Sequence, residues 1–348
     1  MRFPSGMRRY FGVIALGLVA SALLSACGTS PSVLSPSGPI ADKEAWIFWF
    51  ILVVATIIFV GVTSVLLYSV FRFRDRPGAP EARQFHGNTT LEIVWTIVPS
   101  LLLFVILAVT VGTMFAIASP PTPATITVNA IGHQWWWEFQ YPDSKVVTAD
   151  ELHVPVGAVV HVNLISDNVI HSFWIPQLAG KTDVIPGHDN SMWFQATATG
   201  QYRGECAEFC GTQHAHMDFV VVVQPMADYT TWIAQQQSGA AKPLANTPEA
   251  AGQHVFLTSG CVSCHVISGV ANIGKVHIGP DLTHFGSRLW IAGGVLDNNP
   301  QNLQDWILHA QTVKSGVDMP SFDGSSPGTQ ALSSVQINEL VAYLESLK

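Results

Sequence analysis

The 348-residue sequence is poor in charged side chains, which make up only 11% of it, while hydrophobic residues make up 48%. This composition is apolar for a soluble protein of this length. The sequence also lacks a strongly basic segment, so nothing in it predicts nucleic-acid binding. The formal net charge is −8, and residues 121–235 carry eleven acidic side chains against three basic ones. This middle segment predicts either a face that attracts a cationic partner or simple solubility.

Cysteine is scarce as well, with only five residues in the chain. An odd number excludes a framework in which every cysteine joins an intrachain disulfide. The five fall into a single residue and two close pairs, and each group predicts a separate chemistry: Cys27; Cys206 and Cys210; Cys261 and Cys264.

Residues 1–26 are predicted to be a signal peptide of the lipoprotein type. Basic residues precede an apolar run over residues 11–24, which is typical of an export signal. Cys27 follows Leu-Ser-Ala, a string that resembles a bacterial lipoprotein cleavage box and implies a lipid on this cysteine. Ordinary signal cleavage nearby is the alternative. Residues 27–45 begin with many Ser, Pro and Gly residues and are predicted to be a stalk.

Residues 46–119 are predicted to form a transmembrane hairpin. Residues 46–70 and 93–118 contain no charged side chain, and each run exceeds the roughly 20 residues that cross a bilayer. The loop between them is rich in arginine, which places it in the cytoplasm. These residues are Arg72, Arg74, Arg76 and Arg83. The rest of the chain is therefore expected on the outer, periplasmic side of a bacterial plasma membrane.

Glu92 stands at the cytoplasmic end of the second apolar run. An ionisable side chain beside a membrane span can mark a path for protons or ions. A solvated carboxylate at a helix end is the alternative.

Residues 120–235 are predicted to form an all-β sandwich or barrel. Short β-rich runs over residues 125–131, 159–165 and 219–223 alternate with turns rich in Pro, Gly and Asn. The segment has about the size of one such domain.

A dense set of soft metal ligands follows in the same segment. Cys206, Cys210, His214 and Met217 supply thiolate, imidazole and thioether groups, which together select copper. A single blue-copper site needs one cysteine, whereas two thiolates can bridge two copper ions. His171 opens a loop after a β run and is the best second histidine. A disulfide between the cysteines and a zinc site are the alternatives, and methionine is a poor zinc ligand.

These residues, with His-Ser-Phe at 171–173 and Gly-His-Gln-Trp-Trp-Trp at 132–137, resemble cytochrome c oxidase subunit II over about residues 45–235. The resemblance implies a cupredoxin-like domain with a binuclear copper centre. Cys206 and Cys210 would bridge the two ions, and His171 and His214 would each bind one. The remaining ligands it implies are the Met217 thioether and the Glu208 backbone carbonyl.

The same resemblance assigns three further roles. The Glu208 side chain would face a magnesium or manganese ion at the boundary with subunit I. Glu92 would stand where protons enter a channel of subunit I. Trp135 would be the surface aromatic through which electrons enter. Two positions depart from the family pattern, since Trp136 replaces a tyrosine and His188 stands where arginine is common.

Residues 236–249 are small and polar and are predicted to be a linker, followed by a domain over residues 250–348. Cys261, Cys264 and His265 form the Cys-x-x-Cys-His string that attaches haem c. The two thiols would bond the haem vinyl groups, and His265 would bind the iron. A redox dithiol and half of a zinc site are the alternatives, and the adjoining histidine and the exported location argue against both.

The sixth iron ligand is expected to be Met319, which precedes Pro320 on a predicted loop. Its rivals are His277, His284 and His309, and packing is the other explanation for the methionine. This arrangement resembles small class I cytochromes c, with a first helix near residues 250–259 and a closing helical pattern over residues 332–347. The resemblance also implies that the neighbourhood of Pro280 orients His265.

The sequence thus predicts a multidomain fold: a two-helix transmembrane hairpin, an all-β cupredoxin-like domain and an all-α class I cytochrome c domain. The resemblance implies subunit II of a caa3-type oxidase, which takes electrons from a cytochrome c or a reductase complex. Subunit I, and with it subunit III, would be its partners, and subunit I would reduce oxygen to water with proton pumping. The alternatives are a nitrogen-oxide reductase subunit and a free membrane-anchored electron shuttle. The predicted copper ligands argue against a quinol oxidase subunit, since such subunits lack them.

Overall fold

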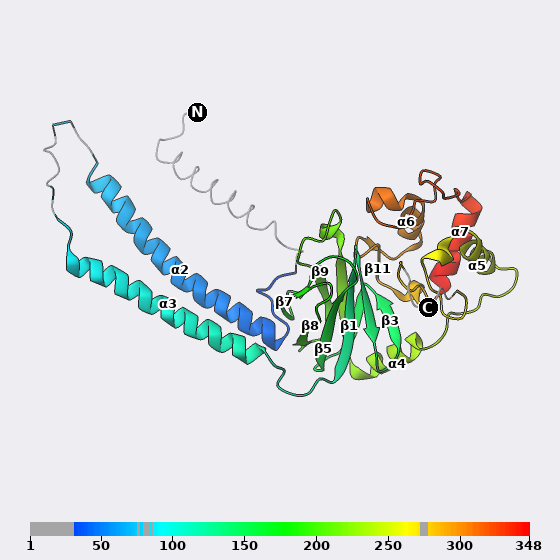
Figure 1. Ribbon diagram of the computed structural model, residues 1–348, viewed down its shortest axis with the longest axis horizontal. Coiled ribbons are helices and arrows are strands. Elements are labelled where there is room, and N and C mark those ends of the chain that lie inside the picture. Colours follow the sequence, from blue (N-terminus) through cyan, green and yellow to red (C-terminus); the bar gives the residue numbers. More distant parts are fainter. Residues whose placement is uncertain (1–30, 75–76, 79–83, 85, 272–277) are drawn as a thin grey trace, which may run out of the picture. The chain divides into compact units, whose positions relative to one another are not determined.

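The computed structural model describes residues 31–74, 77–78, 84, 86–271 and 278–348 (Figure 1). The predictions for the signal peptide, Cys27, Arg76, Arg83 and His277 lie outside these residues.

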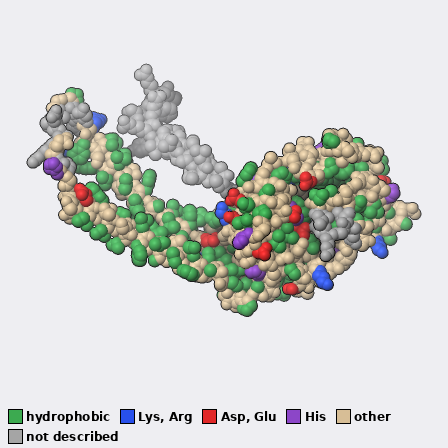
Figure 2. All heavy atoms as spheres, viewed as in Figure 1, with side chains coloured by type: hydrophobic (Ala, Val, Ile, Leu, Met, Phe, Trp, Pro, Cys, Tyr) green, Lys and Arg blue, Asp and Glu red, His purple; other side chains and the backbone are tan. Residues whose placement is uncertain are grey.

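Two long helices confirm the predicted spans. α2 (Pro39–Arg72) and α3 (Thr89–Ile117) are both long and apolar enough to cross a membrane. Their side chains are exposed along most of their length, and Figure 2 shows apolar side chains covering both helices. A surface of this kind is stable in lipid, where the helix satisfies its own backbone hydrogen bonds. The Asn88 side chain caps α3 by accepting from the amides of Thr90 and Leu91.

A sandwich of two five-stranded sheets follows, as the alternating pattern predicted. The first sheet has the order β3-β2-β1-β5-β8: Val146–Ala149, Trp136–Tyr141, Ile126–His133, Val159–Ser166 and Asn190–Gln195. The second has the order β4-β10-β9-β6-β7: Glu151–Pro155, Asp218–Gln224, Gly200–Cys206, His171–Ile175 and Ala179–Val184. The pairs β1·β5 and β4·β10 are parallel, and the other neighbours are antiparallel.

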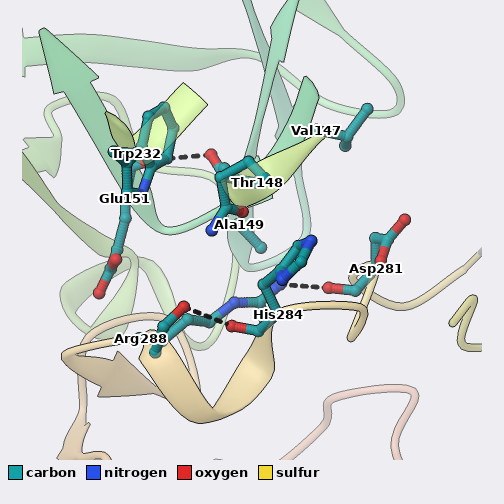
Figure 3. Close-up of a pocket in the computed structure, with 10 residues that line it drawn as sticks. Val147, Thr148, Ala149, Glu151, Trp232, Asp281, His284 and Arg288 are labelled. Carbon is teal, nitrogen blue, oxygen red and sulfur yellow. Dashed lines mark hydrogen bonds between the residues drawn. The ribbon is translucent and has the colours of Figure 1, made fainter. Parts of the chain in front are cut away.

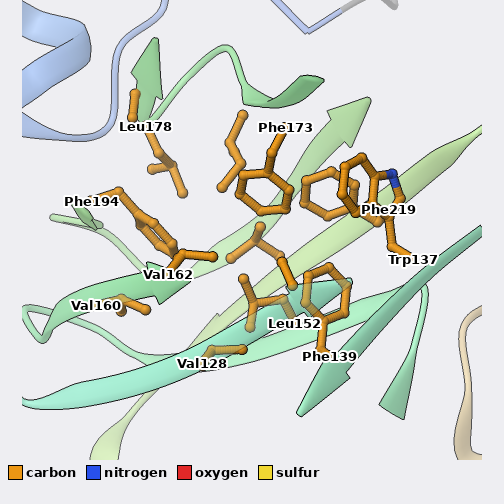
Figure 4. Packing of buried hydrophobic residues seen from close by; sticks show 14 of the residues in the cluster. Val128, Trp137, Phe139, Leu152, Val160, Val162, Phe173, Leu178, Phe194 and Phe219 are labelled. Carbon is orange, nitrogen blue, oxygen red and sulfur yellow. The ribbon is translucent and has the colours of Figure 1, made fainter. Parts of the chain in front are cut away.

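Aromatic side chains fill the core between the sheets (Figure 4). Phe173 and Phe219 stack with ring centroids 4.6 Å apart, and Trp137 meets Phe173 edge-on at 5.3 Å. Each of these rings is fully buried. Burying such large apolar surfaces is the main force that holds the two sheets together.

The C-terminal domain is helical, as predicted, and it follows a short connecting helix, α4 (Met226–Gln236). Its helices are α5 (Pro248–Thr258), α6 (Pro300–Val313) and α7 (Ser334–Ser346), with a small hairpin of β11 (Trp290–Ile291) and β12 (Leu296–Asp297). α5 and α7 cross so closely at Gly252 that a Cβ there would overlap the carbonyl group of Glu339. Glycine is therefore required at this crossing.

One buried carboxylate makes the stability of the sandwich depend on pH. Asp150 joins β3 to β4 with φ at 60°, and its side chain accepts a hydrogen bond from the Trp137 amide at 2.9 Å. Burial raises the pKa of Asp150 from 3.8 to about 6, against the lowering effects of that hydrogen bond and of Lys314 and Arg288. The folded state therefore binds more protons than the unfolded state between these two values, and stability falls as pH rises through them.

Asp150→Asn should remove this penalty, because asparagine keeps the acceptor and tolerates positive φ. We expect the variant to match the parent near pH 4 and to be more stable by about 2 to 3 kcal/mol at pH 8. Urea unfolding at a series of pH values, followed by tryptophan emission, measures this difference. The exposed Asp143→Asn is the control, and an equal effect of both variants at pH 8 would contradict the prediction.

Candidate copper centre and haem-attachment site

His171 is held in one orientation at the start of β6. It is fully buried, and Gly132 on β1 makes room for it, since a Cβ at Gly132 would lie 2.8 Å from the imidazole Cδ2. The imidazole Nε2 lies 3.0 Å from the Asn168 side-chain oxygen, so Nε2 carries the proton. The unprotonated Nδ1 then faces Cys206, with 3.8 Å between Nδ1 and Sγ.

The other predicted ligands lie on the loop between β9 and β10. Both cysteines are free and buried, and their sulfur atoms lie 3.8 Å apart. The Cys210 sulfur is 3.7 Å from His214 Nδ1 and 3.8 Å from the Met217 sulfur. The ligand atoms of His171, Cys206 and Cys210 all lie within 4.8 Å of one another. The fold therefore gathers the predicted histidine, thiolate and thioether ligands at one place.

Glu208 contributes to the copper loop with its backbone, while its side chain is exposed. Its carbonyl oxygen lies 3.2 Å from the Cys206 sulfur, as expected for a backbone ligand. Its side chain is exposed, next to the exposed ring of Phe209. The carboxylate is therefore free to meet a neighbouring protein surface.

The two thiols share their protons unequally. The hydrogen bond from Cys210, helped by backbone groups, lowers the pKa of Cys206 from 9.0 to about 3. The same contact and burial raise the pKa of Cys210. Thiolate is the form that binds metals, so one ligand is already ionised and the second proton is released on metal binding.

The donor set fits a copper pair that shares both sulfurs. Two thiolates, two imidazole nitrogens and a thioether are soft or borderline ligands of the kind that copper prefers. A tetrahedral structural zinc site would leave the thioether without a role.

Trp135 lies beside the copper loop, and its part in electron entry to the copper centre stays a prediction. Its side chain is only 9% exposed, and its indole Nε1 donates to the Cys210 carbonyl at 3.0 Å. The C-terminal domain covers it, since a Cβ at Gly316 would lie 3.9 Å from the indole ring. A contact between domains of this kind leaves no trace in the local sequence around Trp135.

The haem-attachment string forms a tight turn after α5. Cys261 and Cys264 lie in and next to the short helix Cys261–Ser263 and are both free. The Nδ1 of His265 lies 2.9 Å from the Pro280 carbonyl oxygen, which confirms that the proline segment orients this ring. A hydrogen bond at Nδ1 leaves Nε2 for an iron ion, the usual arrangement for a metal-bound histidine. These residues fit a covalently attached haem.

Met319 remains the predicted sixth ligand. It is half-buried against the core of the helical domain, and its carbonyl oxygen accepts from Gln311 Nε2 at 2.8 Å. Two of its rivals are engaged elsewhere: His284 lies 3.0 Å from the Ser238 carbonyl oxygen, and His309 lies 3.3 Å from Asp323.

Sequence reasoning missed the residues that position the ligands. Asn168 holds His171, and Gln134 donates to the Cys210 carbonyl at 2.7 Å. Gly132 and Gly211 make room, the latter because a Cβ there would lie 2.8 Å from the Trp135 ring. The positive φ of 123° at Gly211 is a second reason for glycine at that position. Gly132 and Gln134 lie in the Gly-His-Gln-Trp-Trp-Trp string at 132–137, and Asn168 lies three residues before His171.

We expect the metal-free chain to bind about two copper ions, because two thiolates are available to bridge them. Cys210→Ser should reduce this to about one copper ion or fewer, since a hydroxyl does not bridge copper as a thiolate does. Metal analysis and EPR spectra after copper addition and dialysis measure the result. The exposed His188→Gln is the control and should bind as the parent does. Two retained copper ions in Cys210→Ser would show that this sulfur is not a bridge.

Three family models match successive parts of the chain. They describe the transmembrane domain of cytochrome c oxidase subunit II over residues 33–111, its periplasmic domain over residues 146–224, and cytochrome c over residues 249–348.

Curated relatives extend over nearly the whole chain. Cytochrome c oxidase subunit 2 of Alkalihalophilus pseudofirmus is 35% identical and covers 91% of each chain. The protein of the same name from Bacillus sp. PS3 is 35% identical over 97% of this chain and 96% of its own. Quinol oxidase subunit 2 of Bacillus cereus is 30% identical over 68% of this chain and 84% of its own.

A solved structure also matches. The periplasmic domain of subunit II of cytochrome oxidase from Bradyrhizobium japonicum is 32% identical, with a TM-score of 0.33. It covers 33% of this chain and 96% of its own.

Proposed function

The chain belongs to the cytochrome c oxidase subunit II family, and we propose that it relays electrons from a covalent haem c to a binuclear copper centre and on to subunit I. It is a membrane protein with two transmembrane helices, a periplasmic domain and a C-terminal cytochrome c domain. It is therefore a subunit of a haem–copper oxidase complex of the caa3 type.

The convergence of the copper ligands carries the proposal. Two free thiols whose sulfur atoms lie 3.8 Å apart, each with an imidazole Nδ1 within 3.8 Å, are arranged to hold two ions rather than one. His171 and His214 would each bind one copper, and Cys206 and Cys210 would bridge the pair. Met217 and the Glu208 carbonyl would complete the two coordination shells. Such a pair shares one delocalised electron, which suits fast transfer.

The haem domain would receive the electrons first. Cys261 and Cys264 would hold the porphyrin, with His265 and Met319 on either side of the iron. A histidine–methionine pair gives haem iron a raised potential, which suits one-electron relay. The Pro280 carbonyl fixes the His265 ring, so the ligand is oriented before the iron is bound.

Two carboxylates would face subunit I. The exposed Glu208 side chain would approach a magnesium or manganese ion at that boundary, because its own carbonyl is turned inward toward Cys206. Glu92, in the first turn of α3, would stand where protons enter subunit I from the cytoplasm. Oxygen reduction and proton pumping would take place in subunit I, with subunit III alongside, and a cytochrome c or a reductase complex would donate the electrons.

Quinol oxidation is the rival function, since three relatives from Bacillus carry that name. The full set of copper ligands argues against it, because a quinol-oxidising subunit has no need of a copper relay. A free electron shuttle is disfavoured by the paired spans, which suit a chain that assembles with other membrane subunits.

The first test is an optical and EPR spectrum, with metal analysis, of the purified oxidase complex. We expect a low-spin c-type haem band and a mixed-valence copper signal. Met319→Ala should disturb the haem band and slow oxygen consumption with a reduced cytochrome c by about tenfold or more, because loss of the thioether ligand lowers the potential at which the haem accepts electrons. The exposed Met226→Ala is the control. A single type-1 copper signal, or the absence of a haem band, would contradict the proposed relay.

Glu92→Gln should slow steady-state oxygen consumption by about tenfold or more while leaving the haem and copper spectra unchanged, because the amide does not release a proton. Oxygen electrode and stopped-flow measurements separate this proton-linked step from electron transfer to copper. Asp42→Asn, in the first turn of α2, is the matched control. If Glu92→Gln turns over like the parent, protons enter elsewhere.

A further inference from the structure

A lysine ammonium is buried at the seam between the sandwich and the haem domain. Lys314 follows α6 directly and is only 2% exposed. Its Nζ donates three hydrogen bonds to backbone carbonyls: to Trp135 at 2.7 Å, to His216 at 2.7 Å and to Ala292 at 2.9 Å. An ammonium group has three donors, so all of them are used. Two of the three acceptors belong to the sandwich, and the lysine therefore ties one domain to the other.

The surroundings of this ammonium are built to hold a charge. Asp150 and Asp218 of the sandwich both attract it, although burial still lowers the pKa of Lys314 to about 8. The charged, acidic sandwich predicted from the sequence thus meets a cation from the same chain. A buried charge that loses its partners is costly, because nothing else solvates it.

In the haem domain, two glycines let the backbone approach this contact closely. Gly293 has φ at 69°, and a Cβ there would lie 2.8 Å from the Trp135 carbonyl oxygen. Its own carbonyl accepts from the Asp218 amide at 2.9 Å. Gly294, with φ at 82°, approaches the Asp218 side chain just as closely.

A second set of contacts closes the seam farther along. Figure 3 shows Arg288 and His284 of the haem domain facing Glu151 and Thr148 of the sandwich across a pocket. The Glu151 carboxylate accepts a hydrogen bond from the Leu289 amide. The seam is therefore polar and matched in charge over both sets of contacts.

Lys314 also begins the loop that ends at Met319. Gln213 of the copper loop donates to the Ser315 carbonyl at 2.7 Å, and Val317 packs against the sandwich core. Gln311 donates to the carbonyls of Val317 and Met319 at 2.7 and 2.8 Å. The loop is thus fixed at both ends.

On the copper side, the residue that accepts from Lys314 is also bonded to the copper loop. Trp135 takes the lysine hydrogen bond on its carbonyl and donates from its indole to the Cys210 carbonyl at 3.0 Å. A continuous chain of contacts therefore runs from the Met319 loop through Trp135 to a proposed copper ligand.

We propose that Lys314 is a positioning residue for electron transfer, which locks the Met319 loop onto Trp135 and keeps the haem domain docked over the copper loop. The inference rests on the proposed function. One electron leaves the reduced haem iron and arrives at the oxidised copper pair, and Lys314 neither gains nor loses a proton. Because the docked domain covers Trp135, a separate donor protein delivers its electron to the haem domain and not to Trp135.

The test compares Lys314→Met with the parent in the purified oxidase complex. Methionine keeps much of the apolar stem and removes the three donors. After flash reduction of the haem, the rate at which the copper becomes reduced should fall by about tenfold or more, since each 1.4 kcal/mol lost from docking is a tenfold change in its equilibrium. Hydrogen exchange should also quicken at the Asp218 amide, which the docked Gly293 carbonyl protects. The haem band and the copper EPR signal should stay as they are.

Lys242→Met, at an exposed linker position, is the control and should change neither readout. An unchanged rate and unchanged exchange in Lys314→Met would overturn the proposal. If that variant does not assemble, Lys314→Gln, which keeps two donors, replaces it and should give an intermediate slowing and intermediate exchange. Parent-like values for it would equally refute the proposal. Missing copper or haem signals in the parent would instead refute the proposed function.

Discussion

The register between β6 and β9 is the constraint on which the copper site depends. Phe173 pairs with Cys206, which places His171 and the end of β9 at the same edge of one sheet. Side chains alternate between the two faces of a strand, so a slip of one residue would turn His171 away from the cysteines. The stacked rings of Phe173 and Phe219 hold this register from the core. Hydrophobic packing thus fixes the geometry of the ligands, and Cys206, Cys210 and Met217 are themselves part of this core.

The residues around the ligands, rather than the ligands themselves, set the geometry of the site. Glycine at 132 leaves space for an imidazole, and glycine at 211 lets the loop pass under an indole ring. Asn168 settles which nitrogen of His171 faces the cysteines. A site assembled before the metal arrives needs little rearrangement on binding, which also keeps rearrangement small when an electron comes or goes.

The contacts between the sandwich and the haem domain likewise fix an orientation, here between two domains. A flexible linker alone would keep the haem domain near the copper loop, but it would not orient it. Buried hydrogen bonds to Lys314 and close glycine contacts do orient it. The sequence left two explanations for the acidic excess of the sandwich, a cationic partner or simple solubility. Part of this excess is matched by cations of the same chain.

The sequence by itself determined the two spans, the alternating strands, the copper loop and the haem string, because each has a local signature of hydropathy, period or spacing. It also identified His171, although from 35 residues before Cys206, and the orienting role of Pro280. Only the tertiary structure decided that Trp135 is covered and that Lys314 is buried. Both depend on two domains meeting across more than 170 residues of chain, and no local pattern records which surfaces will meet.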